Sequence, residues 1–246
     1  VAKRKKIPVF HMEAGNRCYD ENVPEETNRR VVDSVSEFLL PYTQRSRENL
    51  LSEWYHSSKI IVTWNPITEV IEKYSSEIWE REIKNDYILV TLHRDENVTN
   101  KENLENIVNS LNEISKKYRV ILSVHPKLEE MLKKFDIKLE KNIETSKPFT
   151  FKKFLNLEKY ATCVLTDSWT VPEECCILKT PCILLRTSTE RPELLENNSM
   201  ILSGITKQEI LISMKVAMET EIWEIPNDYK DKNVSEKILK LLLRHI

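Results

Sequence analysis

Short apolar runs alternate with amphipathic segments along most of this chain. The apolar runs cover residues 86–92, 119–124, 162–166 and 181–186. The clearest amphipathic segment covers residues 101–117, where apolar residues recur at steps of three and four and Asn100 can cap the first turn. Continuous apolar strands joined by helices are typical of a parallel sheet with crossover connections. We therefore predict a doubly wound α/β domain for this part of the chain.

The remaining pattern divides the chain into two predicted domains. Further helices are predicted over residues 127–134, 150–159, 171–178, 207–220 and 234–244. Toward the N-terminus the pattern predicts one strand over residues 7–12, a helix over residues 24–37 and one or two more helices, too few to close a sheet. We therefore predict that residues 1–66 are the C-terminal remainder of a first Rossmann-like domain and that residues 67–246 form a second one. In an alternative arrangement, residues 234–246 pack back on the first domain.

Composition and charge narrow the functional classes. Of the 246 residues, 40% are hydrophobic, enough for a folded globular core. The chain carries 37 Lys and Arg against 39 Asp and Glu, a formal charge of -2, so no basic field would hold nucleic acid or an anionic membrane. No apolar run approaches the roughly 20 residues that span a bilayer. Five cysteines without paired spacing, and a basic N-terminus without an apolar signal core, favour a cytoplasmic protein.

Two features of the sequence are unusual. The chain has two glycines, although an average usage of about 7% would give roughly 17. It also begins with Val1, and the first strand pattern follows almost at once. The second feature predicts that this sequence is a fragment of a longer protein.

Polar residues that follow the predicted strands are the candidates for chemistry, because ligands of open parallel sheets bind beyond the carboxyl ends of the strands. Four segments meet this criterion, namely residues 11–15, 91–97, 124–126 and 166–174. They contain three of the five histidines, His11, His93 and His125. We therefore expect a functional site along this edge of the sheet.

Residues 166–174 are suited to a phosphate group, because a hydroxyl and unbonded backbone N–H groups converge where a helix dipole is positive. An ordinary helix cap by Asp167 or Ser168 is the alternative. Glu173 or Glu174 could reach a ribose hydroxyl, or could only complement the helix dipole.

Basic residues follow two of the other strands. His93 and Arg94 could bring charge to a diphosphate, although a lone histidine at a strand end is more often structural. Arg186 and Arg191 flank a loop after another strand, for which a surface ion-pair loop is the alternative. Each of these signals is weak by itself.

Taken together, the motifs resemble a known family. They are His11-Met-Glu-Ala-Gly-Asn-Arg17, Pro24-Glu-Glu-Thr-Asn-Arg29, Thr91-Leu-His-Arg94 with Glu96-Asn97, Val124-His125-Pro126, Thr166-Asp-Ser168 with Glu173-Glu174, and Thr189-Glu-Arg-Pro-Glu193. In order and spacing they are similar to the non-hydrolysing UDP-N-acetylglucosamine 2-epimerases. The resemblance covers nearly the whole chain.

The resemblance implies an α/β fold with Rossmann-like parallel-sheet domains of GT-B type and a UDP-sugar in the cleft between them. It also implies that the first domain is only partly present and that a catalytic Asp lies outside this sequence. The implied isomerase reaction inverts C2 of UDP-GlcNAc to give UDP-ManNAc for polysaccharide biosynthesis, by elimination and re-addition of UDP. The resemblance implies no nicotinamide, other cofactor or metal, and it suggests a homodimer.

The resemblance assigns roles to individual residues. Glu13 and Glu25 match the catalytic carboxylates of the family, and His93 matches its catalytic histidine. The diphosphate would be held by Ser168, Trp169 and Thr170, the ribose by Glu174 and the uracil by Phe154, with Arg29 and Arg191 lining the cleft. Phe154 would otherwise be interpreted as a core residue of its helix. Arg94 and His125 resemble residues of a second, allosteric UDP-GlcNAc site.

Two other functions remain open. One is an epimerase of a related UDP-2-acetamido sugar in the diacetamido-uronate or fucosamine pathways, since residues 16–20 resemble the fucosamine-pathway enzymes about as well. The other is an inactive UDP-sugar-binding module.

Three tryptophans stand where members of the family have glycine. They are Trp54, Trp64 and Trp169. An indole at position 169 would obstruct a backbone that must approach a diphosphate. We hypothesise that UGA codons, read as glycine in the source organism, were rendered as tryptophan, and that Trp79 and Trp223 are further instances. A decayed, inactive paralogue is the alternative.

Overall fold

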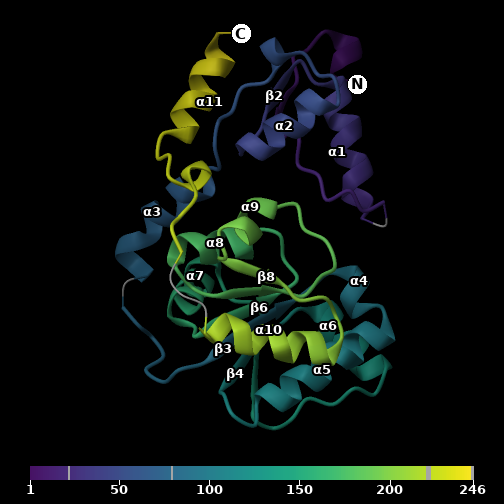
Figure 1. The fold of residues 1–246 in the computed structure, drawn as a ribbon, viewed down its shortest axis with the longest axis vertical. Helices are drawn as coiled ribbons and strands as arrows, with labels where there is room; N and C mark the ends of the chain where they lie inside the picture. Colours follow the sequence, from purple (N-terminus) through teal and green to yellow (C-terminus); the bar gives the residue numbers. More distant parts are fainter. Residues whose placement is uncertain (22, 79, 220–222, 245–246) are drawn as a thin grey trace. The chain divides into compact units, whose positions relative to one another are not determined.

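The chain folds as two compact α/β units (Figure 1). The computed structural model describes residues 1–21, 23–78, 80–219 and 223–244, so that Trp79 lies outside the described residues. The first unit comprises Val1–Glu72, Ser188–Glu193 and Ile225–Ile246, and the second comprises Lys73–Thr187 and Leu194–Glu224. The predicted domain division after residue 66 stays a prediction, and each unit is described by itself.

The second unit contains a six-stranded parallel sheet. Its strands, in spatial order, are β5 (Ile143–Ser146), β4 (Val120–Val124), β3 (Ile88–Leu92), β6 (Cys163–Thr166), β7 (Cys182–Leu184) and β8 (Met200–Leu202). This order confirms the predicted doubly wound sheet. The sequence pattern misses β5 and β8, which are short strands at the two edges of the sheet; two residues of β5 are exposed, and two residues of β8 are half-buried.

Helices connect these strands, and most of them lie close to the predicted ranges. They are α4 (Asp95–Val98), α5 (Lys101–Ile114), α6 (Pro126–Lys134), α7 (Phe151–Tyr160), α8 (Val171–Leu178), α9 (Pro192–Glu196) and α10 (Lys207–Glu219). Asn100 caps α5 as predicted, since its side chain accepts hydrogen bonds from the backbone N–H groups of Glu102 and Asn103 at 3.0 and 3.2 Å.

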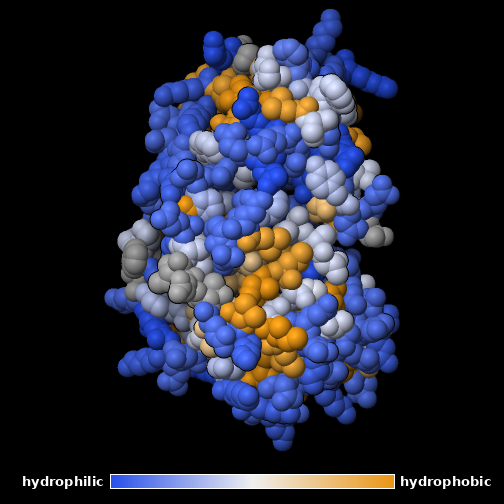
Figure 2. Space-filling view, in the orientation of Figure 1, coloured by the Kyte–Doolittle hydropathy of each residue, from blue (hydrophilic) through white to orange (hydrophobic). Residues whose placement is uncertain are grey.

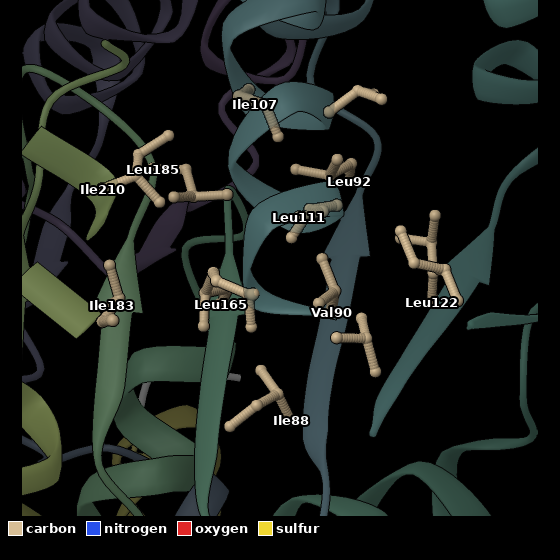
Figure 3. Close-up of a cluster of buried hydrophobic side chains, with 14 of the residues drawn as sticks. Ile88, Val90, Leu92, Ile107, Leu111, Leu122, Leu165, Ile183, Leu185 and Ile210 are labelled. Atoms are coloured by element: carbon tan, nitrogen blue, oxygen red, sulfur yellow. The ribbon is translucent and has the colours of Figure 1, made fainter. Parts of the chain in front are cut away.

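The two faces of this sheet carry separate apolar clusters. On one face Val90 of β3 packs with residues of α5, α6 and α10, as Figure 3 shows in part. On the other face Leu89 of β3 packs with Leu157 of α7 and Val171 of α8. Successive strand residues point to opposite faces, so a continuous apolar run fills both clusters. This explains why the strands show no alternation of polar and apolar residues.

The first unit contains a two-stranded parallel sheet of β1 (Phe10–Met12) and β2 (Phe38–Leu40). The prediction of one strand in this region was therefore wrong, because β2 directly follows helix α1 and its three residues do not stand out as a separate apolar run. Besides α9, whose first two residues belong to this unit, the elements that begin here are η1 (Lys3–Lys5), α1 (Pro24–Val35), α2 (Gln44–Ser52), η2 (Ser57–Lys59), α3 (Ile67–Ile78), η3 (Asn227–Tyr229) and α11 (Val234–Leu243). Ser235 at the start of α11 hydrogen-bonds Glu69 of α3.

Apolar side chains also reach the surface of the second unit. In Figure 2 they gather over α10, on which Ile212 and Val216 are exposed. Beside them a hollow of about 470 Å³ is bordered by Ile114, Met214 and Met218, among others. Within the described ranges, none of the helices has the length and apolar character needed to cross a lipid bilayer.

Candidate active site

The strand order of the second unit creates a topological switch point between β3 and β6. From β3 the chain continues to β4 and β5 on one side, and then returns to β6, β7 and β8 on the other. Thr91 and Thr166 are paired near the carboxyl ends of β3 and β6. Ligands of open α/β sheets bind at such a point. His93 follows β3 directly, and Asp167 and Ser168 follow β6.

Asp167 lies beside His93 at the switch point. Its fully buried carboxylate accepts the backbone N–H of His93 at 3.1 Å and that of Arg94 at 3.0 Å. The distance from His93 Nδ1 to Asp167 Oδ1 is 3.4 Å. Burial raises the pKa of Asp167, while the nearby His93 and the N–H donors act in the opposite direction. A carboxylate at Nδ1 orients the imidazole and leaves Nε2 for a ligand.

Helix α8 begins without a side-chain cap. Its N-cap residue is Thr170, whose side chain accepts no hydrogen bond from the first turn. The alternative of an ordinary cap by Asp167 or Ser168 was therefore wrong, because the Asp167 carboxylate is turned toward the end of β3. The Ser168 backbone N–H donates to Thr166 Oγ1 at 3.0 Å, and Ser168 Oγ lies 3.5 Å from Thr170 Oγ1.

The Trp169 ring lies against two arginines of the same unit. The guanidinium carbon of Arg94 is 3.4 Å from the ring centroid, and that of Arg186 is 4.9 Å from it. Both arginines are buried. Arg186 Nε also lies 3.8 Å from Glu96 Oε1. The indole thus covers guanidinium surface of both arginines, an arrangement stabilised by cation–π attraction.

Glu174 forms a buried acid pair with Glu158 of α7. Both residues are buried, and none of the described residues donates an N–H or hydroxyl hydrogen bond to the Glu158 carboxyl. Burial raises the pKa of Glu158 well above its ordinary value, and the neighbouring Glu174 raises it further. Burial also raises the pKa of Glu174. Burial, together with the neighbouring carboxyl group at Glu158, therefore favours the protonated, neutral form of these acids.

Phe154 and His125 have structural contacts in the second unit. Phe154 is half-buried and packs against the cluster that contains Leu89 and Leu157. His125 is exposed and caps α6, since its Nδ1 accepts the backbone N–H of Lys127 at 3.4 Å. The ligand roles of both residues stay predictions.

In the first unit the candidate base Glu13 lies in the loop after β1, which we call the Glu13 loop (residues 13–17). The φ angle of Glu13 is 64°, a left-handed conformation that non-glycine residues rarely adopt. Its Oε1 accepts hydrogen bonds from Asn16 Nδ2 at 2.7 Å and Arg191 Nη2 at 2.6 Å. Residues held in this conformation tend to cluster at functional sites.

The Glu13 loop is anchored from both sides. The backbone N–H of Gly15 donates to Asp33 of α1, and a Cβ at Gly15 would lie 2.2 Å from the Ser46 carbonyl oxygen, so only glycine fits. Arg17 donates to Asp33 at 2.7 Å and to both carboxylate oxygens of Glu53. Burial opposes the charge of Arg17, but the bonds to Glu53 and Asp33 raise its pKa overall. His11 completes the cluster with its Nδ1 2.6 Å from Asp33 Oδ1.

The other two candidates of this unit lie on α1. Glu25 is half-buried in the first turn. Arg29 lies 3.3 Å from Glu190 and 3.4 Å from Glu26. The structure therefore pairs both Arg29 and Arg191 with carboxylates.

The structure thus groups the candidates into two sets. The second unit brings together His93, Arg94, Ser168 and Trp169, and the first brings together Glu13 and Arg191. Sequence reasoning missed the contacts of Asp167, Arg17 and Asn16, because these depend on partners far along the chain or on loop geometry. Glu158 did carry a signal, since it follows Phe154 by four residues and so occupies an apolar position of its helix.

Comparisons with known proteins identify the family of the chain. A family model for UDP-N-acetylglucosamine 2-epimerase matches residues 1–243. The chain is 39% identical over 263 residues to the UDP-N-acetylglucosamine 2-epimerase of Methanocaldococcus jannaschii, covering 98% of this chain and 70% of the relative. A more distant relative, 28% identical over 250 residues, is the UDP-2,3-diacetamido-2,3-dideoxy-D-glucuronate 2-epimerase of Pseudomonas aeruginosa; the match covers 99% of this chain and 70% of that protein.

A solved structure gives the same result. The crystal structure of the M. jannaschii enzyme in complex with UDP-GlcNAc and UDP matches with a TM-score of 0.93 and 38% identity. The match covers 99% of this chain and 71% of that chain. The expected fold class, α/β with Rossmann-like parallel sheets of GT-B type, is confirmed. On these grounds the chain belongs to the UDP-N-acetylglucosamine 2-epimerase family.

Proposed function

We propose that this protein interconverts UDP-GlcNAc and UDP-ManNAc. The observation that carries the proposal is the switch point of the second unit, where His93, its buried partner Asp167 and the start of α8 meet at one edge of a parallel sheet. A strand end followed by a helix start is suited to a phosphate group. The membership of the chain in the family supports a UDP-sugar as the ligand of this edge.

The reaction requires one proton transfer and one bond cleavage in each direction. A carboxylate takes the proton from C2, the electron pair forms the C1–C2 double bond, and the C1–oxygen bond breaks to release UDP. UDP then adds back to C1 while C2 receives a proton on the opposite face. The overall change is neutral in redox terms and needs no external oxidant or reductant.

Each candidate residue has a proposed part in this reaction. Glu13 and Glu25 are proposed as the carboxylates that serve C2, and His93, in its protonated form, stabilises the charge that develops on departing UDP. The UDP contacts are proposed to come from the side chains of Ser168, Thr170, Glu174, Phe154, Arg29 and Arg191 and from the backbone of Trp169, whose indole would obstruct the approach of the diphosphate. An effector role for Arg94 and His125 and a homodimer are also proposed on the resemblance alone. A cytoplasmic location is proposed on the five cysteines without paired spacing.

Exchange at C2 tests the proposal directly. The protein, expressed from its complete reading frame, is incubated with UDP-GlcNAc in deuterated water and followed by proton NMR. We expect loss of the C2 proton signal and appearance of UDP-ManNAc, and we expect Glu13→Gln to lower the exchange rate at least 100-fold. Binding of UDP-GlcNAc without deuterium uptake would identify an inactive binding module instead.

A related UDP-2-acetamido sugar is the second candidate substrate. The match to the P. aeruginosa enzyme and residues 16–20 of this chain favour it. The same assay with UDP-2,3-diacetamido-2,3-dideoxy-D-glucuronate and with a UDP-2-acetamido-2,6-dideoxyhexose decides between the substrates. Exchange with one of these sugars and none with UDP-GlcNAc would replace the primary proposal.

A further inference from the structure

The Glu13 loop contains a buried amide that the proposed reaction does not use. Asn16 is 1% exposed, and its Nδ2 donates to Glu13 Oε1 at 2.7 Å. Its Oδ1 accepts the hydroxyl of Ser46 at 2.8 Å. A carboxylate can only accept a hydrogen bond and a hydroxyl can donate one, so these two neighbours determine which way the amide points.

Ser46, the partner of this amide, is itself fixed at the start of α2. Thr43 is the N-cap residue of that helix, and its Oγ1 accepts the backbone N–H of Ser46 at 3.0 Å. The Thr43 hydroxyl also donates to Ser46 Oγ at 3.0 Å. Thr43 and Ser46 are each 3% exposed. A chain of hydrogen bonds therefore runs from the start of a helix to the Glu13 carboxylate, and only its last bond, from Asn16 to Glu13, is partly exposed.

Both hydrogen bonds to Glu13 fall on the same oxygen. Arg191 Nη2 donates to Oε1 at 2.6 Å, as Asn16 does at 2.7 Å. Among the residues that the structure describes, none donates to Oε2. The Glu13 side chain is 47% exposed. Oε2 is therefore the oxygen left to take a proton from a ligand.

We propose that Asn16 is a positioning residue, which holds Oε1 of Glu13 so that Oε2 is directed at the C2 proton of the substrate. This inference rests on the proposed function, and specifically on Glu13 as one of the carboxylates that serve C2. The amide acts through its geometry, because it restricts rotation of the carboxylate about the last side-chain bond. Productive geometry of this kind is lost with displacements of about 1 Å.

Two substitutions at position 16 test the proposal. Asn16→Leu has nearly the same size and removes the donor, whereas Asn16→Asp replaces the donor by a second acceptor that repels Glu13. Ser46→Ala provides a milder third variant that removes only the group that orients the amide. The matched control is Asn49→Leu, because Asn49 Nδ2 donates to the Gly15 carbonyl of the same loop at 3.0 Å and does not contact Glu13.

The measurements are kcat and KM for the sugar nucleotide, the C2 exchange rate and the Kd of UDP. For Asn16→Leu we expect kcat and exchange to fall about 10- to 100-fold, with KM and the UDP Kd within about twofold. Asn16→Asp is expected to lose more activity than Asn16→Leu, and Ser46→Ala less. Asn49→Leu is expected to lower the unfolding temperature and to keep kcat within about threefold.

Two results would overturn the inference. One is a kcat of Asn16→Leu within twofold of wild type, or, if that variant does not fold, an unchanged kcat of Ser46→Ala. The other is a loss of kcat in Asn49→Leu equal to that in Asn16→Leu, which would assign Asn16 a general role in loop stability. If the wild-type protein is active and either of these results is found, this inference is refuted and the proposed function stands. If the wild-type protein shows no C2 exchange, the proposed function is refuted, and this inference with it.

Discussion

Trp54 has a backbone conformation that suits glycine. Its φ angle is 68°, and it follows the C-cap residue of α2. The backbone N–H of Trp54 donates to the Leu51 carbonyl, and that of Tyr55 donates to the Leu50 carbonyl, each at 3.1 Å. This is a Schellman motif, in which glycine is the usual residue at the left-handed position. The Trp54 side chain is 94% exposed, so it contributes little packing to offset the strain.

Replacing Trp54 by glycine is therefore expected to stabilise the protein. Trp54→Gly should raise the free energy of unfolding by about 1 kcal/mol, because a left-handed conformation costs about 1–2 kcal/mol for a residue with a Cβ. In a chain of this size the melting temperature should rise by about 2–4 °C, as measured by calorimetry. Trp54→Ala is the control, since alanine keeps the Cβ. An equal gain in both variants would contradict the backbone explanation.

The other tryptophans differ in whether they agree with the hypothesis that glycine codons were rendered as tryptophan. Trp64 also has a left-handed φ of 70°, which agrees with it. Trp223 is buried and its indole N–H donates to the Cys176 carbonyl at 3.1 Å, which favours a genuine tryptophan there. The codons at positions 54, 64 and 169 decide the question, because UGG would exclude misdecoding.

Position 169 affects ligand binding in our proposal. Trp169→Gly would uncover the guanidinium faces of Arg94 and Arg186, which could then approach a diphosphate. We expect the variant to bind UDP at least tenfold more tightly, as measured by isothermal titration calorimetry. Trp169→Phe keeps an aromatic ring and should show no comparable gain. Unchanged or weaker UDP binding by the glycine variant would mean that the indole does not obstruct the site.

Among the helices and strands, the longer helices and the four interior strands of the six-stranded sheet were predicted well, and its two edge strands were not. Helix α8 was predicted over residues 171–178 and observed over Val171–Leu178. Its sequence combines an acidic first turn with a preceding apolar strand, two signals that are both local. By contrast β5 and β8, at the edges of that sheet, and β2 in the first unit were not predicted, and none of them lies in one of the apolar runs that marked the other strands. Their strand conformation depends on pairing with a neighbour that local sequence does not reveal.

The facing helices α7 and α8 predict a pH dependence of stability. The pKa values of Glu158 and Glu174 are both raised, chiefly by burial, so the folded state holds more protons than the unfolded state. The contribution of this pair to the free energy of unfolding is then fully present below the pKa of about 4.3 that glutamate has in the unfolded chain. It is lost as the pH rises through the raised pKa values of the folded state. The free energy of unfolding should fall by up to about 1.4 kcal/mol per pH unit for each proton that the folded state retains.

Urea unfolding at several pH values checks this prediction. Glu158→Gln keeps the shape and the hydrogen-bonding capacity of the protonated acid, and we expect it to reduce the loss of stability above pH 5. Glu96→Gln is a control, because this half-exposed carboxylate lies outside the acid pair. A wild-type profile that is flat or rises with pH above 5 would show that the pair does not retain a proton.

At the scale of the whole molecule, the two units carry different parts of the proposed reaction. The carboxylate Glu13 belongs to the first unit, whereas His93 and Ser168 belong to the second. We therefore expect substitution of the carboxylate Glu13 to affect C2 exchange and substitution of Ser168 to affect nucleotide binding.

Paired variants test this division. Glu13→Gln should abolish C2 exchange and keep the UDP Kd within about twofold, whereas Ser168→Ala should weaken UDP binding about tenfold, since a hydrogen bond to a charged group contributes about 1.5–3 kcal/mol. Calorimetry measures the binding, and NMR measures the exchange. A loss of UDP affinity in Glu13→Gln equal to that in Ser168→Ala would contradict the division.

The sequence by itself determined the order of strands and helices in the second unit and the residue types that follow each strand. Both follow from local rules, namely the spacing of apolar residues and the signals that begin and end helices. Only the tertiary structure decided that Asp167 faces His93, that Glu158 pairs with Glu174 and that Asn16 and Arg191 meet on one oxygen of Glu13. These contacts arise because β6 lies beside β3 and because loops are anchored on helices far along the chain. Neither arrangement produces a repeating spacing of apolar residues that could be recognised in the sequence.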